Sequence, residues 1–288
     1  MARSEDDFDG RGARRGYERA ESPALPLRGM IDAARRQALI IFALVVREFR
    51  LRSRDNPFRQ LIDAASMLVI VGAHMVLLLF FDKAVPYGDS DVVFICSGLF
   101  PILFFRLLAN KVIGFVKTSG RLGPLPMVHP LDYVFALAIV DGLTLLFTFV
   151  CFFLVLELIG ISRYATPFDP IQIAIAIAFA FPLAIGVGLV NAHVIFLFPV
   201  WRPIWMMISR LQMIFAAVFF LPERLPPLLR TIIWYNPASH IVALVRTAFY
   251  PAYPTFMISL PYLGAWVLFS LLIGLAMQKS MRSRLAEA

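Results

Sequence analysis

The stretch from Pro222 to Phe256 reads PERLPPLLRTIIWYNPASHIVALVRTAFYPAYPTF and lies between two apolar segments of membrane length. Six of the chain's 20 prolines fall within it: Pro222, Pro226, Pro227, Pro237, Pro251 and Pro254. Proline interrupts a helix interior, so this stretch is too broken to cross a bilayer as one helix, and it is too apolar to be an ordinary loop. We interpret it as two short helices that enter one face of the membrane and return.

The second of these helices has a readable start. Asn236 before Pro237 is a capping residue followed by proline at the first helical position. Apolar residues then recur at helical spacing: Ile241, Leu244, Val245, Ala248 and Phe249. His240 and Arg246 lie off this stripe. The pattern predicts either a gate that dips into the membrane or an amphipathic pair lying flat on the outer leaflet.

The composition indicates a membrane protein that crosses the bilayer several times. Of 288 residues, 60% are hydrophobic, 14% are aromatic and only 16% are charged. The formal net charge of +8 is first an orientation signal, because cytoplasmic segments of membrane proteins retain Lys and Arg. Nucleic-acid binding is therefore disfavoured. Cys96 and Cys151 lie in apolar runs, and we expect them to be packing residues.

The apolar runs define the predicted fold. A helix needs about 20 apolar residues to cross the hydrocarbon core. Six segments qualify: 61–81, 92–108, 131–157, 171–196, 203–221 and 259–278. We predict an all-α integral membrane protein with six transmembrane helices, an interfacial N-terminal helix and two short external gate helices before the last span. Residues 30–280 form this transmembrane domain, between a disordered cytoplasmic tail (1–29) and a second tail (281–288).

The distribution of basic residues tests the direction in which the helices cross. No signal peptide is recognisable, so we expect the N-terminus in the cytoplasm. An even number of crossings then places 106–130, 197–204 and the tail from Lys279 inside, with 82–91, 158–170 and 222–258 outside. Of the 27 Lys and Arg residues, 21 fall in the inner segments, five fall outside, and Arg210 falls within a span. This asymmetry supports the assignment.

Two cytoplasmic elements are predicted from local patterns. Residues 31–52 have a nine-residue apolar centre, too short to span, flanked by arginines, and are typical of a helix lying along the membrane surface. They serve either as a plain anchor or as a docking element for a cytoplasmic partner. Residues 109–130 are longer than a tight connection requires, and they form either a short projecting helix or a solvated loop.

Motifs for catalysis are missing from the sequence. No GxxxxGK[ST] run occurs, because Val116 and not Gly precedes Lys117-Thr118, so the chain lacks a phosphate-binding loop. There is no HExxH, no GxSxG and no metal-binding spacing of cysteines. We therefore expect no catalytic residue, no metal site and no cofactor in this chain.

Polar and aromatic residues within the spans are the candidate functional groups. Charged groups in hydrocarbon usually face a wet cavity or a partner. Arg210 either snorkels to the interface or lines a polar path near Gln212, and Asp141 either neutralises an arginine or lines the same path. Trp201 and Trp205 either belong to an interfacial belt or offer platforms to sugar rings.

These elements, in this order, resemble the permease subunit of ABC-2 type exporters, particularly those that export capsular polysaccharide. The resemblance covers residues 30–280 and includes PMVHPLDYVFALAIVD (Pro126 to Asp141) and WYNPASHIVALVRTAFYPAY (Trp234 to Tyr253). The second segment is the more specific, because an aromatic residue before Asn-Pro, a His and a closing Phe-Tyr-Pro recur in polysaccharide exporters.

The resemblance implies a function and a set of partners. The chain would be a non-catalytic, multi-pass permease of the bacterial inner membrane, with both termini cytoplasmic, that exports lipid-linked polysaccharide as a homodimer. Two separate ATPase subunits would hold ATP and magnesium, and a periplasmic adaptor would receive the chain. The helix over residues 31–52 would be the interface helix, and residues 114–126 would couple to the ATPase through Gly114, Lys117, Arg121 and Pro124.

The same comparison gives roles to the candidate residues. The gate would include Pro226, Arg230, Tyr235, Asn236 and Pro237. The substrate path would include Arg210, Gln212, Trp201, Trp205, Phe104, Phe105, Arg246, His240 and Tyr250. Three alternatives stay open: an ABC-2 exporter of O-antigen, teichoic acid or a small drug; an ion-coupled carrier using Asp141 or His74; and a membrane glycosyltransferase, which the short inner loops disfavour.

Overall fold

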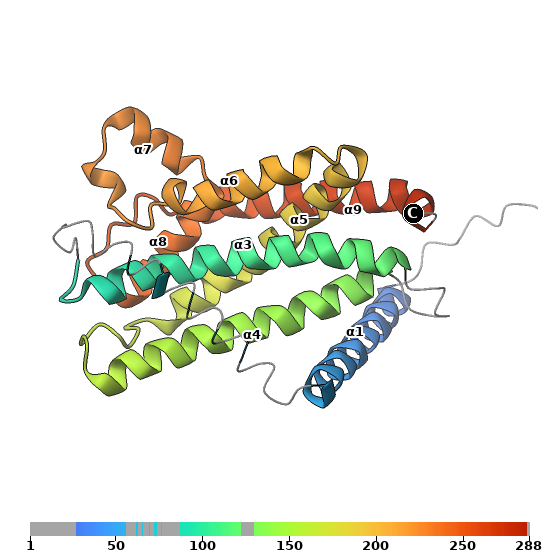
Figure 1. The fold of residues 1–288 in the computed structure, drawn as a ribbon, viewed down its shortest axis with the longest axis horizontal. Coiled ribbons are helices and arrows are strands. Elements are labelled where there is room, and N and C mark those ends of the chain that lie inside the picture. Colours follow the sequence, from blue (N-terminus) through green and yellow to red (C-terminus); the bar gives the residue numbers. More distant parts are fainter. Residues whose placement is uncertain are drawn as a thin grey trace, which may run out of the picture. The chain divides into compact units, whose positions relative to one another are not determined.

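The computed structural model describes residues 27–55, 87–121 and 130–286, together with six positions between Ile62 and Val76 (Figure 1). The described residues form helices and no strand. In chain order these are α1 (Leu27–Asp55), α3 (Asp91–Arg121), α4 (Pro130–Ile159), α5 (Pro170–Leu197), α6 (Trp201–Phe215), the 3-10 turn η1 (Pro222–Arg224), α7 (Pro227–Trp234), α8 (Pro237–Phe249) and α9 (Leu260–Ala286).

The chain divides into two compact units, residues 1–39 and residues 40–288. The helix predicted over residues 31–52 is present as α1, and the division falls within it. In the first unit, the side chains from Ile31 to Leu39 are exposed. In the second unit, Leu44 is buried and Arg52 forms ion pairs. The predicted N-terminal tail lies outside the described residues up to residue 26.

Four helices of the described residues are long and apolar enough to cross a membrane. Their apolar parts are Asp91–Gly114, Leu131–Ile159, Pro170–Leu197 and Leu260–Met281, which correspond to the second, third, fourth and sixth predicted spans. Most of the first predicted span, 61–81, lies outside the described residues. The prediction of six spans is therefore supported for four of them.

The fifth predicted span, 203–221, is not among these four, because α6 ends at Phe215 after only 15 residues. At 1.5 Å per residue this helix is about 22 Å long, shorter than the roughly 30 Å hydrocarbon core. The chain turns away at Ala217, which has a φ of 57° in the left-handed region. The sequence between Phe215 and Leu221 contains no Gly or Pro that would predict this turn.

α3 is longer than the predicted span 92–108, and this corrects the topology of the following segment. The helix continues without a break to Arg121, so residues 109–121 are helical and not part of a loop. Its apolar part alone runs to Gly114. Arg106 and Lys111, assigned to the cytoplasmic segment 106–130, consequently lie within the span.

α3 and α5 form the centre of the helix bundle. The two helices approach closely at Gly188 of α5, where an added Cβ atom would lie 2.7 Å from Cβ of Val112 and 2.8 Å from the carbonyl oxygen of Ala109 on α3. Only glycine permits this approach. α9 packs against α5, α4 packs against α3, and α6 contacts both central helices. α4 and α5 contact each other far less, and the space between them holds a small apolar pocket.

α8 corrects the prediction of an amphipathic helix with one polar face. Eleven of its 13 residues are buried, and they include His240 and Arg246 from the supposed polar side. The helix packs against both α3 and α5. It therefore lies in the interior of the fold, which argues against a pair of helices lying flat on the outer leaflet.

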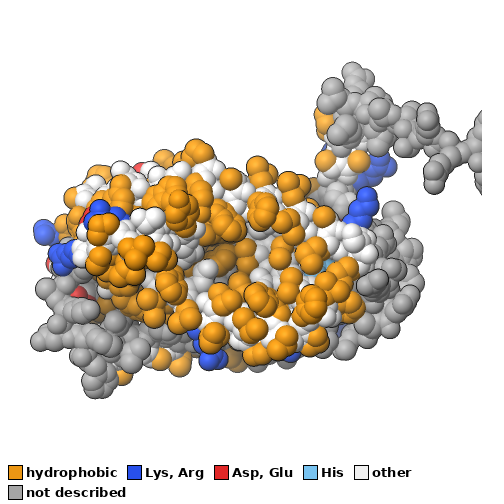
Figure 2. Space-filling view, turned by 90° about the horizontal axis from the view of Figure 1, so that it is seen from above, with side chains coloured by type: hydrophobic (Ala, Val, Ile, Leu, Met, Phe, Trp, Pro, Cys, Tyr) orange, Lys and Arg blue, Asp and Glu red, His pale blue; other side chains and the backbone are white. Residues whose placement is uncertain are grey.

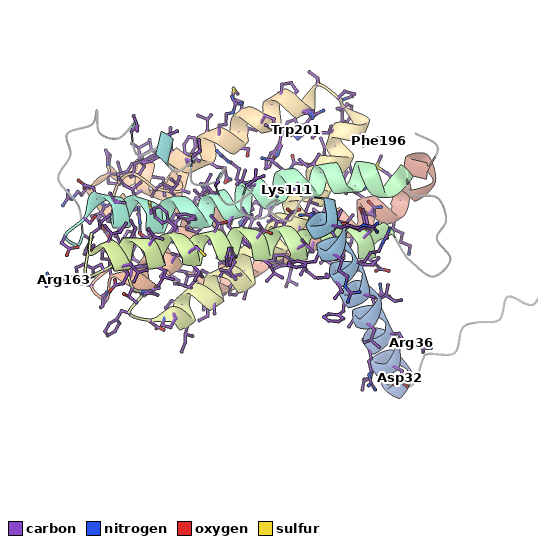
Figure 3. The ribbon with its side chains drawn as sticks, turned by 60° about the horizontal axis from the view of Figure 1, so that its bottom comes forward. Asp32, Arg36, Lys111, Arg163, Phe196 and Trp201 are labelled. Atoms are coloured by element: carbon purple, nitrogen blue, oxygen red, sulfur yellow. The ribbon has the colours of Figure 1, made fainter. Side chains whose placement is uncertain are left out.

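We name the two ends of the bundle for use below. The basic end is where α3 ends at Arg121 and α6 begins at Trp201. The tyrosine end is where Tyr87, Tyr164, Tyr250 and Tyr253 pack together, with ring centroids 5.3–6.4 Å apart. Lys111 and Trp201 lie toward the basic end, and Arg163 lies at the opposite end (Figure 3).

The surface of the second unit is largely apolar, as a lipid-facing surface requires. Figure 2 shows hydrophobic side chains spread over the face that carries α6, α7 and α9, with Lys and Arg side chains toward its edges. The large exposed apolar side chains on these helices include Met206, Met207, Leu211, Leu228, Ile232, Leu268, Phe269 and Leu272.

Candidate functional site

A polar contact joins α3 to α6 within this apolar fold. Asn110 of α3 donates a hydrogen bond to the hydroxyl of Ser209 at 3.3 Å, and its carbonyl oxygen accepts one from the indole nitrogen of Trp205 at 2.8 Å. Asn110 therefore uses both ends of its amide to hold α6. Trp205 is only 8% exposed, so its ring belongs to the helix contact.

Two arginines lie beside this contact. Arg106 is one turn before Asn110 on the same face of α3, and Arg210 follows Ser209 on α6. The bond of Asn110 to Ser209 brings these two positively charged side chains into the same region of the α3–α6 contact. Arg106 is half-buried, Arg210 is exposed, and neither forms an ion pair within the described residues. From the sequence, Arg210 is a candidate path residue, whereas Arg106 is assigned to the cytoplasmic segment 106–130.

The opposite arrangement is found between α3 and α4. Asp141, whose side chain is 4% exposed, accepts hydrogen bonds from Lys111 Nζ at 2.5 Å and from Arg52 Nη1 at 3.0 Å. Arg52 also pairs with Glu48 at 2.9 Å. The prediction that Asp141 neutralises an arginine is confirmed. Lys111 as the second partner is not apparent from the sequence, because residues 109–130 are expected to form a projecting helix or a solvated loop outside the span.

Arg246 was predicted to touch substrate, but the structure encloses it completely. It is 0% exposed and donates hydrogen bonds to the carbonyl oxygens of Ala217 at 2.9 Å and Val218 at 2.5 Å. Its guanidinium lies 4.0 Å from the ring centroid of Phe94, a cation–π contact. Gly98 has no side chain, so the guanidinium can occupy the space beside it. In this single chain Arg246 therefore holds the turn that ends α6, and it has no exposed surface to offer a substrate.

His240 and Tyr250, two further predicted path residues, are also buried. The backbone nitrogen of Ser259 donates to Nδ1 of His240 at 3.1 Å, so this nitrogen carries no proton and Nε2 donates to the carbonyl oxygen of Trp234 at 2.8 Å. Burial lowers the pKa of His240, which keeps the ring neutral. Tyr250 packs within the tyrosine end, where burial raises its pKa.

The remaining path residues are divided among different surfaces. Phe104 lines the apolar pocket between α4 and α5, and Phe105 is buried in the core. The indole nitrogen of Trp201 donates to Oδ1 of Asn191 at 2.8 Å, which ties the start of α6 to α5. Oε1 of Gln212 is buried and has no hydrogen-bond partner among the described residues. The Asn110 contact therefore holds Trp205 and Ser209, the residue before Arg210, whereas Phe104 lines the pocket and Phe105 lies in the core.

The predicted gate residues lie in and around α7. Pro226 precedes α7, and Arg230 donates to the carbonyl oxygens of Glu223 at 3.3 Å and Leu225 at 3.4 Å, which closes the turn that leads into the helix. Asn236 caps α8, as predicted, by accepting from the backbone nitrogen of Ala238 at 3.1 Å. Pro237 is the first residue of α8, and Tyr235 between the helices is exposed.

Asn236 has a second contact that the sequence did not reveal. Its side-chain nitrogen donates to the carbonyl oxygen of Phe215 at 2.9 Å, the last residue of α6. The start of α8 is thus fixed to the end of α6. His240 fixes the end of α7 and the approach to α9 in the same way, so α6, α7, α8 and α9 are joined by side-chain hydrogen bonds at this end.

The predicted coupling residues belong to α3 and not to a separate short helix. Gly114, Lys117 and Arg121 all lie within α3, and Pro124 lies outside the described residues. A force applied at the end of α3 would therefore act on the helix that carries Arg106, Asn110 and Lys111. Within the described ranges, no group of three or more His, Cys, Asp or Glu side chains could hold a metal ion.

Comparison with known proteins identifies the family. Residues 40–250 match the ABC-2 type transporter family. Over 250 residues the chain is 25% identical to one polysialic acid transport protein KpsM of Escherichia coli and 26% identical to another, and each comparison covers 85% of this chain and 94% of the relative. Because the family match spans most of the four-helix core and both helices before α9, the chain belongs to the ABC-2 type transporter family of membrane-spanning, non-catalytic transport subunits.

Proposed function

We propose that this chain is the permease subunit of an ATP-driven exporter that moves lipid-linked capsular polysaccharide across the bacterial inner membrane. The observation that carries the proposal is the similarity to two polysialic acid transport proteins over 85% of the chain. The similarity covers nearly the whole length of both relatives, so the proposal concerns the complete permease and not one shared segment.

In this proposal two copies of the chain line the channel, and two separate ATPase subunits bind ATP and magnesium in the cytoplasm. The basic end faces the cytoplasm, in agreement with the distribution of Lys and Arg along the sequence. A periplasmic adaptor receives the polysaccharide at the tyrosine end. The predicted gate, formed by α7 and α8, lies at that outer end.

The geometry of α3 offers a mechanism for coupling. ATP-driven closure of the ATPase subunits pushes on residues near Arg121, and α3 transmits the movement because it is continuous from Asp91. The ion pairs of Asp141 with Lys111 and Arg52 carry α4 and the second part of α1 along. The contacts of Asn110 with Ser209 and Trp205 carry α6.

Purification with candidate ATPases tests the proposal. The chain is co-expressed with each ATPase, reconstituted in lipid, and assayed for ATP hydrolysis with and without a capsule glycolipid. We expect stable capture of one ATPase and stimulation of hydrolysis by the glycolipid. A glycolipid with an unrelated neutral glycan is the matched control. Failure to capture any ATPase would contradict the exporter, and capture with stimulation by small drugs alone would exclude polysaccharide as the substrate.

A further inference from the structure

The unpaired arginines between α3 and α6 carry an inference beyond the family assignment. Arg106 and Arg210 carry like charges, and their helices are held together beside them by the bonds of Asn110 to Ser209 and Trp205. The hydrogen bonds of Asn110 thus keep two like charges close to each other where α3 and α6 otherwise pack through apolar side chains. Such an arrangement lowers the stability of the empty protein, so a packing role does not explain it.

Other cationic side chains of the fold interior are compensated. Lys111 and Arg52 share the carboxylate of Asp141, and Arg246 is surrounded by two carbonyl oxygens and the ring of Phe94. For Arg106 and Arg210 the described part of the chain supplies no carboxylate and no hydrogen-bonded carbonyl. An anionic group of another molecule would compensate the two charges that the described residues leave unbalanced.

The positions of the two arginines along their helices are also related. Asn110, one turn after Arg106, bonds to Ser209, the residue before Arg210, so the two arginines lie at neighbouring levels of α3 and α6. Both helices are entered from the basic end. An anion that enters there meets the two guanidinium groups at neighbouring levels.

Arginine is suited to one class of anion. Its planar guanidinium presents paired N–H donors that match the two oxygens of a carboxylate or phosphate. Two such groups on adjacent helices favour an oxyanion over a neutral hydroxyl of a sugar. Trp205 and Asn110, which lie beside them, are occupied with each other and keep the helices in place.

We infer that Arg106 and Arg210 form an oxyanion site on the path of the transported glycolipid, where they bind a carboxylate of an acidic sugar or a phosphate of its lipid carrier. The inference rests on the proposed export function, because it names the chemical group that the path recognises. It adds Arg106, and its pairing with Arg210, to the residues that determine which substrates pass.

Substitution in the complete transporter tests the site. The complex with its ATPase is reconstituted in lipid as wild type, Arg106→Gln, Arg210→Gln, Arg106→Lys and Arg163→Gln. The last variant removes an arginine whose side chain is 79% exposed at the tyrosine end and is the matched control. Glycolipid-stimulated ATP hydrolysis is measured with three substrates: an acidic glycan on a phosphate carrier, a neutral glycan on the same carrier, and an acidic glycan on a carrier without phosphate.

We expect Arg106→Gln and Arg210→Gln each to raise the half-saturating concentration of the acidic glycolipid about tenfold, as the loss of a charge-assisted hydrogen bond predicts. Arg106→Lys retains part of the response, and Arg163→Gln retains all of it. A loss confined to the two acidic glycans identifies the carboxylate, and a loss confined to the two phosphate carriers identifies the phosphate. An equal loss with all three substrates, or no loss with any, overturns the inference.

A second measurement separates this site from the export function. The melting temperature of the purified full-length chain is measured in detergent with increasing inorganic phosphate, with chloride at equal ionic strength as the reference. A ligand that binds the folded state raises this temperature. We expect a phosphate-dependent rise in wild type and Arg163→Gln and its loss in Arg106→Gln. If no glycolipid stimulates hydrolysis but this rise is present, the export proposal fails and the site stands; if the rise is absent or unchanged in Arg106→Gln, the site fails.

Discussion

The two sides of α3 handle charge in opposite ways. On the side facing α4, Lys111 meets a buried carboxylate that a second cation, Arg52, also binds. On the side facing α6, Arg106 meets another arginine and no acid among the described residues. The two residues are only five positions apart on one helix, and both lie within its apolar part.

This difference separates structural charge from functional charge. A compensated charge in the interior holds helices in one arrangement, because breaking the pair leaves the partner uncompensated. An uncompensated charge stabilises nothing until a ligand supplies the opposite sign. We therefore expect substitutions on the α4 side to act on stability, and substitutions on the α6 side to act on the response to substrate.

Removing the shared anion of the α4 side has the largest expected effect. Asp141→Asn leaves Lys111 and Arg52 without their carboxylate, and we expect the free energy of unfolding to fall by about 3 kcal/mol. The loss stays below the upper end of the range for buried pairs because the side chain of Lys111 is 39% exposed. Chemical unfolding in detergent micelles, followed by circular dichroism, measures the change.

Glu48→Gln is the matched control for this substitution, because it removes a carboxylate from the same cluster but leaves Asp141 in place. We expect it to change stability far less. Equal effects of the two variants would show that the buried position of Asp141 has no special importance. The claim that the α4 side of α3 carries charges that stabilise the fold would then be wrong.

Arg246 is compensated without any acid, and this gives the second prediction. Arg246→Met keeps an unbranched apolar stem but removes the guanidinium that binds the carbonyl oxygens of Ala217 and Val218. We expect a loss of about 2 kcal/mol, since unsatisfied buried acceptors lose their hydrogen bonds without regaining water. The melting temperature in detergent measures it, with Arg163→Met as the exposed control. An unchanged melting temperature would contradict the packing role.

The third prediction concerns a substitution that adds a negative charge on the α6 side of α3, next to the unpaired arginines. Asn110→Asp preserves the acceptor for Trp205 and introduces a carboxylate one turn from Arg106 and next to Ser209. We expect it to stabilise the folded chain by about 1 kcal/mol, as a new ion pair does, and to weaken the response to acidic glycolipid. Asn110→Ala, which loses both hydrogen bonds and adds no charge, is the control.

Opposite signs for stability and substrate response are the diagnostic result of this third test. If Asn110→Asp destabilised the chain as much as Asn110→Ala, the arginines would already have a partner, and the α6 side would not differ from the α4 side. Unfolding in detergent and ATP hydrolysis in lipid, measured on the same preparation, decide between these outcomes.

The parts of the fold that depend on local sequence were predictable. Apolar length identified the four helices of the described residues that can cross a membrane, and Asn236 before Pro237 correctly marked the start of α8. Both signals act over a few residues: the length of an apolar run and the pairing of a cap with the next backbone N–H groups. The resemblance to ABC-2 permeases is confirmed by the family match over residues 40–250.

The errors all involve contacts between distant residues. The prediction ended the second span at residue 108 because polar residues follow, but the charge of Lys111 is neutralised by Asp141, 30 positions later. α6 ends at Phe215 without a Pro or Gly signal, where Arg246 binds the carbonyl oxygens of the turn from 28 and 29 positions away. Arg106 was overlooked for the same reason, since its closeness to Arg210 depends on how α3 and α6 pack.

The smallest expected effect concerns the protonation of His240, which the fold disfavours. Burial lowers the pKa of His240 from 6.5, and the bond to the Trp234 carbonyl opposes this shift less strongly. The histidine therefore contributes stability that is fully present above pH 6.5 and is lost as the pH falls below it, because protonated Nδ1 cannot accept from Ser259. We expect the melting temperature in detergent to fall modestly between pH 7.5 and pH 5.5, and this slope to be reduced in His240→Gln. An equal slope in both proteins would assign the pH dependence to other groups. A reduced slope would show that the fold disfavours an uncompensated positive charge at His240, in contrast to the two unpaired arginines between α3 and α6.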